Sequence, residues 1–157
     1  DTPAAPARRH GPQAEPAAPG LRDPAVAALE ALVALAAADG VRVHLELPAT
    51  REATDWPCGW ALPSAWVRDP SGAGVGVHAW REGAVDPETP AQEAARVADA
   101  VHEHLVEHRP GLGRSTSWPE CPHHPQTHPL ELAPGSNSDP RPRWRCPRTH
   151  EVVTPLG

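Results

Sequence analysis

The chain has 157 residues, which is typical of a single domain, and a formal net charge of −6 with neutral histidines. This acidity excludes an overall basic surface for nucleic acid, and no apolar run approaches the roughly 18 residues needed to span a bilayer. All fourteen basic residues are arginine, and Phe, Tyr and Met are missing, so the core must come from Leu, Val, Ala and six Trp residues. Because alanine buries little area, we expect a thin core that gains from a metal or disulfide crosslink.

Three regions differ in composition. Residues 1–22 are rich in Ala and Pro and have no periodicity, so we expect a disordered arm. Residues 23–112 carry the periodic patterns of an α+β domain. Residues 113–157 form a distinct tail rich in Pro, Cys and His.

The first periodic segment, residues 23–40, predicts a helix. Asp23 suits the N-cap, Pro24 the first helical position and Gly40 the residue that ends the helix. The residues that share one face at helical spacing are Leu29, Leu32, Val33 and Ala36.

Strand patterns follow, and then a second helix. Residues 41–48 alternate apolar and polar side chains, and residues 64–82 predict two strands around a Pro/Ser/Gly turn. In residues 89–111, Thr89 and Gln92 have the spacing of a capping box. We therefore predict an α+β fold in which two helices pack on a small antiparallel sheet.

The tail predicts two short strands, around residues 130–132 and 143–145, joined by a turn-rich loop. A hairpin of this size is marginal by itself. We therefore expect an additional interaction that stabilises the hairpin.

Cysteines and histidines bracket this hairpin. Cys121 and His124 stand at C-x2-H spacing before it, and Cys146 and His150 stand at C-x3-H spacing after it. Structural zinc takes four thiolate or imidazole ligands in a tetrahedron, often two from each of two tight turns. The sequence therefore predicts a structural zinc site in a zinc-ribbon-like tail.

The residues leave the fourth ligand open. His128 begins the first predicted strand and Cys146 follows the second, so an antiparallel pairing also brings His128 close, with His150 spare. Two alternatives contain no metal: a Cys121–Cys146 disulfide that leaves Cys58 free, and a histidine-rich loop with nothing bound. The odd number of cysteines argues against a secreted disulfide framework, and we expect a cytoplasmic protein.

The tail also resembles the C-terminal segment of small actinobacterial proteins of unknown function. These tails carry a CPxH turn, an HPL step and a WxCP turn, and the residue usage fits a GC-rich genome of that kind. The matching positions in this sequence are Cys121, His124, His128, Trp144, Cys146 and Gly157. The resemblance covers about forty residues, favours His128 over His150 and implies no activity.

Two other motifs contain residues that could bind a metal or act as a nucleophile. His104 and His108 lie four apart on the second helix and could chelate a metal, but histidines and Arg109 near a helix C-terminus more simply complement the helix dipole. Cys58 lies between two Trp residues and could be a nucleophile or a remote ligand, although a free buried cysteine is common.

The function we predict is non-catalytic: a protein-interaction or regulatory module with structural zinc, which binds an unknown protein partner. Nucleic acid is a weaker partner, suggested by the basic residues around Trp144. One alternative is a metal-dependent hydrolase-like enzyme with ligands Cys121, His124 and Cys146, an activated water, and Glu120 or Glu151 for proton transfer. Another is an antitoxin- or immunity-type protein dedicated to one partner.

Overall fold

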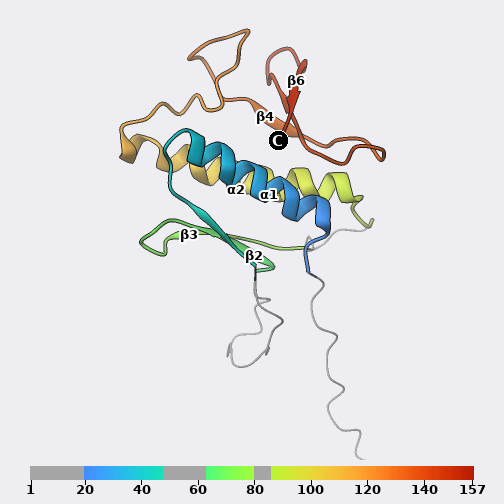
Figure 1. Ribbon diagram of the computed structural model, residues 1–157. Coiled ribbons are helices and arrows are strands. Elements are labelled where there is room, and N and C mark those ends of the chain that lie inside the picture. The colour runs from blue at the N-terminus through green and yellow to red at the C-terminus, as the bar shows by residue number, and fades with distance from the viewer. Residues whose placement is uncertain (1–19, 48–62, 80–85) are drawn as a thin grey trace, which may run out of the picture.

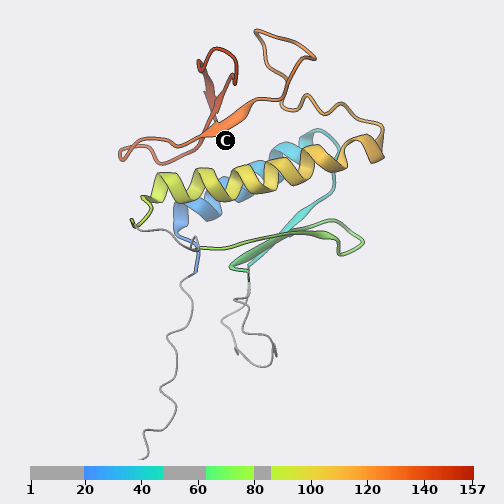
Figure 2. The ribbon, with the colours of Figure 1, turned by 180° about the vertical axis from the view of Figure 1, so that it is seen from behind.

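In the computed structural model a layer of two helices lies between two small sheets (Figures 1 and 2). The structure describes residues 20–47, 63–79 and 86–157. The order of elements is α1, β1, β2, β3, α2, a 3-10 turn, β4, β5 and β6, and each sheet is antiparallel with three strands in sequence order. The α+β class is confirmed.

Helix α1 spans Asp23–Ala38 and ends in a Schellman motif. Gly40 has a φ of +75°, which favours glycine, and the amides of Gly40 and Val41 donate to the carbonyls of Ala37 and Ala36 at 2.9 Å each. The predicted end of the helix is confirmed. The predicted N-cap is wrong by one residue: Arg22 occupies that position without a side-chain hydrogen bond, and Asp23 is already helical.

Helix α2 spans Pro90–His108 and begins as predicted. The Thr89 hydroxyl accepts from the amide of Gln92, and the Gln92 side chain accepts from the amide of Thr89. Most of its buried side chains are small, which lets α1 and the two sheets approach closely. They are Ala91, Glu93, Ala94, Ala95, Val97, Ala98, Val101, His102 and Leu105.

The first sheet contains β1 (His44–Glu46), β2 (Ala65–Arg68) and β3 (Gly74–Val77). Ala65 pairs with Val77 and Val67 with Val75, and these four side chains lie on the face toward the helices. The predicted strand at residues 41–48 is shorter in the structure because only three of its residues pair with β2. The two strands around the turn are confirmed.

The second sheet is formed by the tail. It contains β4 (Glu131–Ala133), β5 (Arg143–Arg145) and β6 (Val152–Pro155). Leu132 and Trp144 are partners in the register, and both are buried. Strand β6 was not predicted, because its Val, Thr and Pro residues show no alternating pattern.

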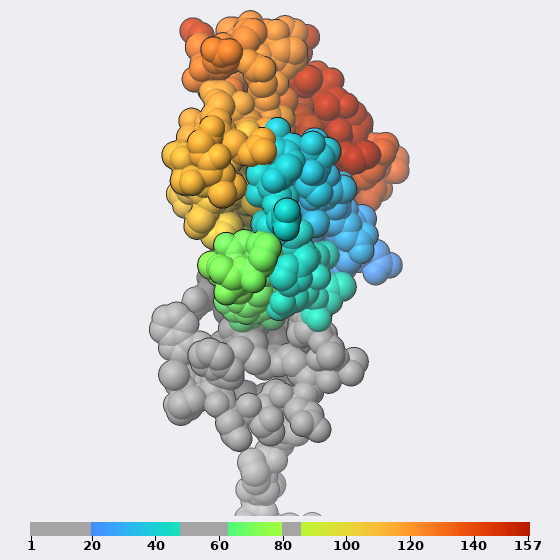
Figure 3. All heavy atoms as spheres, turned by 60° about the vertical axis from the view of Figure 1, so that its left-hand side comes forward, coloured from blue at the N-terminus to red at the C-terminus, as the bar shows by residue number. Residues whose placement is uncertain are grey.

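The tail sheet packs on the helices opposite the first sheet. Trp118, Trp144 and Leu156 belong to the same core cluster as the buried residues of α1 and α2. In Figure 3 the tail atoms, orange to red, lie directly on the helix atoms. The tail therefore shares its hydrophobic core with the helices. None of the helices in the described ranges is long and apolar enough to cross a membrane.

Candidate metal centre

Four side chains from two segments converge at one end of the tail sheet. Cys121, His124 and His128 come from the loop before β4, and Cys146 follows β5 directly. Their ligand atoms all lie within 4.8 Å of one another, and this is the one group of possible metal ligands in the part of the chain that the structure describes. Two thiolates and two imidazoles form a donor set typical of zinc.

Three sulfur–nitrogen distances in this group are close to the edges of a zinc tetrahedron. His124 Nδ1 lies 3.7 Å from the sulfur of Cys121 and 3.4 Å from the sulfur of Cys146, and His128 Nε2 lies 3.9 Å from the sulfur of Cys146. Zinc–sulfur and zinc–nitrogen bonds of about 2.3 and 2.0 Å require sulfur–nitrogen edges of about 3.5 Å. The four side chains are therefore placed where they could hold a metal ion.

The hydrogen bonding of His128 prepares its ring for a metal. Its Nδ1 lies 2.9 Å from the carbonyl oxygen of Pro129, and since a carbonyl only accepts, Nδ1 carries the proton. The other nitrogen, Nε2, then has a free lone pair directed into the four-residue group. Metal-binding histidines generally fix their tautomer by this kind of hydrogen bond.

Cys146 lies in a turn that stabilises its thiolate. Burial raises the pKa of the thiol, but hydrogen bonds from the Thr149 hydroxyl and from the amides of Thr149 and Arg148 outweigh it and lower the pKa to about 6. The turn is closed by the amide of His150, which donates to the carbonyl of Cys146 at 2.8 Å. A cysteine in this environment is well suited to bind a cation.

His150 lies outside the four-residue group, although the C-x3-H spacing made it a candidate ligand. Its backbone has a φ of +60°, its side chain is 69% exposed, and its Nδ1 faces Glu131 at 4.0 Å. His123 also points away, with Nε2 3.7 Å from Glu151. The turn after β5 therefore supplies Cys146 alone, and His128 completes the set.

The two cysteines of the group are free thiols in this structure and are fully buried. The alternative of a Cys121–Cys146 disulfide is therefore not the state that the structure shows. The predictions for Cys58 concern a residue outside the described ranges.

One histidine of α2, His102, does not have the role expected for the histidines near the helix C-terminus, which was to complement the helix dipole. His102 is buried between α2 and the tail, where its ring packs on Trp118 and against the edge of Trp144. Its Nε2 donates to the carbonyl of Trp118 at 2.7 Å. His102 thus joins the tail to the helix as a neutral ring and does not complement the helix dipole as a cation. No local sequence pattern indicates this role beyond the place of His102 on the buried face of the helix.

His102 makes the stability of the fold sensitive to acid. Burial lowers the pKa of His102 below its usual value, an effect larger than the opposing ones of the Trp118 hydrogen bond and of Asp99. As the pH falls below about 6.5, the unfolded chain takes up a proton that the folded chain does not, so stability decreases. We expect His102→Gln, which keeps a donor for Trp118, to lose less unfolding free energy than wild type between pH 7 and pH 5.

Urea denaturation at several pH values measures this difference. His44, whose side chain is 55% exposed, provides the control, and His44→Gln should retain the wild-type slope. All other histidines are present in all three proteins, so the comparison isolates the substituted residue. Equal slopes for His102→Gln and wild type would contradict this role of His102.

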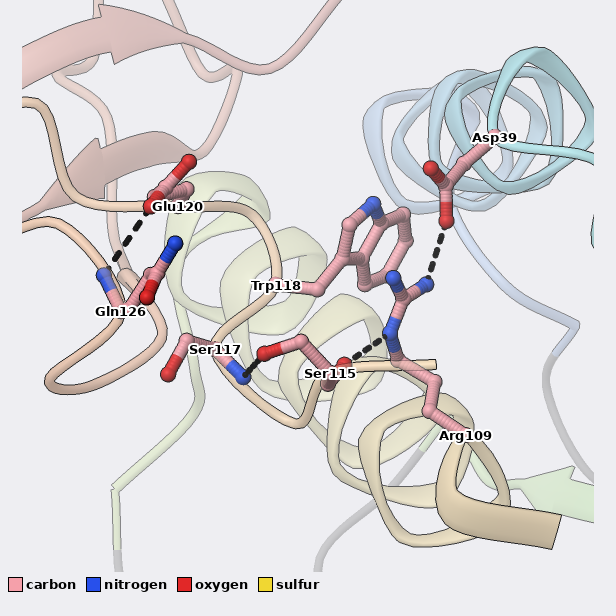
Figure 4. Close-up of a pocket in the computed structure, with 7 residues that line it drawn as sticks. All are labelled: Asp39, Arg109, Ser115, Ser117, Trp118, Glu120 and Gln126. Atoms are coloured by element: carbon pink, nitrogen blue, oxygen red, sulfur yellow. Dashed lines mark hydrogen bonds and ion pairs between the residues drawn. The ribbon is translucent and has the colours of Figure 1, made fainter. Parts of the chain in front are cut away.

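A polar hollow lies beside the loop that carries Cys121, His124 and His128 (Figure 4). It has a volume of about 670 Å³ and is lined by Asp39, Arg109, Ser115, Ser117, Trp118, Glu120 and Gln126. The guanidinium of Arg109 lies over the Trp118 ring, donates to Asp39 and to the carbonyl of Ser115, and is buried. Glu120 accepts from the amide of Gln126 at 3.0 Å. The Arg109 bonds connect Asp39, at the end of α1, with the start of the tail at Ser115, whereas the Glu120 bond lies within the loop.

Comparisons with protein-family models, with curated proteins and with solved structures found no match to this chain.

Proposed function

We propose that this protein is a non-catalytic interaction or regulatory module whose tail is held by a structural zinc ion. The observation that carries the proposal is the gathering of two sulfurs and two imidazole nitrogens within 4.8 Å. The ligands would be Cys121, His124, His128 and Cys146, in a ribbon-like arrangement around β4 and β5. Zinc binding requires reduced thiols, which favours a reducing compartment such as the cytoplasm.

The number of ligands supports a structural role for the metal. Four protein ligands fill a zinc tetrahedron, whereas catalytic zinc keeps one position for water or substrate. A hydrolase-like site with three ligands would need His128 to stay away, but its Nε2 lies 3.9 Å from the sulfur of Cys146. Of the two carboxylates considered for proton transfer, Glu120 accepts from Gln126, and Glu151 is 63% exposed beside His123.

The surface of the tail supports a protein partner better than a nucleic acid. Trp144, which would have to stack on a base, is buried against the helices. Three of the four arginines around it pair with acids: Arg145 with Glu131 at 2.7 Å, and Arg141 and Arg143 with Asp139 at 2.9 and 3.7 Å. These pairs reduce the positive charge that is available to bind phosphates.

Zinc affinity in two histidine variants tests the ligand set. We expect His128→Ala to weaken zinc binding by about a hundredfold or more, since loss of an outer-shell contact alone costs up to about that much. His150→Ala should bind zinc as wild type does. Competition with a chromophoric chelator measures both affinities. The opposite ranking would replace His128 by His150 in the site, and no measurable zinc affinity in wild type would overturn the proposal.

A further inference from the structure

We propose that the four-residue site is a redox switch, in which Cys121 and Cys146 give up the zinc ion and form a disulfide when hydrogen peroxide oxidises them. This inference rests on the proposed function, because it describes how the same zinc site would be regulated. Its reactants are the two thiolates, a peroxide and the bound zinc ion.

The two sulfurs are neighbours that come from different segments. The sulfur of Cys121 lies within 4.8 Å of the sulfur of Cys146. A disulfide has a sulfur–sulfur length of about 2.05 Å, so closure requires a movement of less than about 3 Å. Both thiols are free, and no sulfur of another residue belongs to the group.

Zinc can stay bound at this site only while both cysteines are present as thiolates. Cys121 and Cys146 provide both thiolates, and a disulfide sulfur is no longer an anionic ligand. Oxidation leaves only His124 and His128, too few for the tetrahedral coordination of structural zinc. Disulfide formation and zinc binding therefore exclude each other at this site.

The limited solvent access to the two sulfurs determines which oxidants can reach them. Both cysteines are fully buried, whereas His124 and His128 are partly exposed and form the side of the site that meets solvent. A small uncharged molecule such as hydrogen peroxide fits this access. A bulky charged oxidant such as glutathione disulfide does not.

The chemistry is balanced with peroxide as the two-electron oxidant. The Cys146 thiolate attacks one peroxide oxygen, the O–O bond breaks, and a sulfenic acid and hydroxide form. The Cys121 thiolate then attacks that sulfur, the S–O bond breaks, and a second hydroxide leaves. Two protons from solvent convert both hydroxides to water, and the zinc ion departs unchanged in oxidation state.

The tail can keep its fold both in the zinc-bound state and in the disulfide state. The disulfide would connect the loop before β4 with the turn after β5, the same two segments that zinc connects. Trp118, Trp144 and Leu156 anchor the tail to the helices without using the metal. The switch therefore changes metal occupancy and the environment of the two partly exposed histidines, His124 and His128, while the tail stays in place.

The test uses the full chain loaded with zinc, with a chromophoric chelator present to report released metal. On treatment with hydrogen peroxide we expect one zinc per chain to be released, the free thiols to fall by two, and peptide mapping to find Cys121 linked to Cys146. Dithiothreitol followed by zinc should restore the original state. Glutathione disulfide at the same concentration should release zinc more than about tenfold more slowly.

Cys58→Ser provides the matched control, because it removes the third cysteine of the chain. It should release zinc at the wild-type rate and lose both remaining thiols. Retained zinc under peroxide, sulfinic acid at Cys146 without a linked peptide, or a disulfide to Cys58 would each overturn the switch. The zinc content measured before peroxide is added tests the proposed function separately. A chain that contains zinc before the treatment and retains it afterwards contradicts only the switch.

Discussion

Replacing Cys146 with serine is expected to abolish zinc binding and the stability that zinc provides. A ligand that binds only the folded state stabilises it by about 4 kcal/mol when its free concentration is a thousandfold above Kd. Without the Cys146 sulfur three ligands remain, and zinc-dependent stabilisation should disappear at micromolar zinc. Urea denaturation with added zinc and with chelator measures the difference.

This comparison separates a metal effect from a packing effect. A serine in place of a buried thiol can destabilise the chain by itself, but it would then lower both curves, with zinc and with chelator, by the same amount. Cys58→Ser, outside the four-residue group, should keep the wild-type difference between the curves. If Cys146→Ser also keeps that difference, the sulfur does not bind the metal.

Replacing Trp144 with alanine is expected to cost about 3–5 kcal/mol of unfolding free energy. Trp144 is 4% exposed, pairs with Leu132 across the sheet and packs its ring against His102 of α2. Because the tail and the helices share one core, the loss should appear in the unfolding of the whole chain. Far-UV circular dichroism in urea measures it without relying on tryptophan fluorescence.

Trp66→Ala is the matched control on the other sheet. This side chain is half-buried on the outer face, with the Arg68 guanidinium 4.0 Å above its ring, and its loss should cost about 1–2 kcal/mol. A cost below about 1 kcal/mol for Trp144→Ala, with the helices unfolding as in wild type, would show that the tail is not part of the shared core.

The sequence predicted the helix ends well where one or two residues determine the local backbone conformation. Thr89 and Gln92 set the start of α2, and Gly40 sets the end of α1, because caps depend on one or two side chains and their neighbours. The packing of the tail on the far side of the helices depends on long-range contacts. The periodicity of α2 shows that it is amphipathic, but does not show that two sheets and a second helix share its surface.

The site could be predicted in its chemistry but not in its full geometry. The positions of Cys121, His124 and Cys146 around a hairpin indicated a metal site, and the structure brings these three together. The choice between His128 and His150 depends on the backbone of the turn after β5, where a positive φ turns His150 outward. The buried role of His102 needed the position of the tail, which no local pattern contains.

The most direct test is X-ray absorption at the zinc edge on protein purified without chelator. We predict one zinc per chain with two sulfur neighbours at about 2.3 Å and two nitrogen neighbours at about 2.0 Å. No zinc signal, or a shell with a water oxygen in place of one of the four protein ligands, would contradict the structural zinc site.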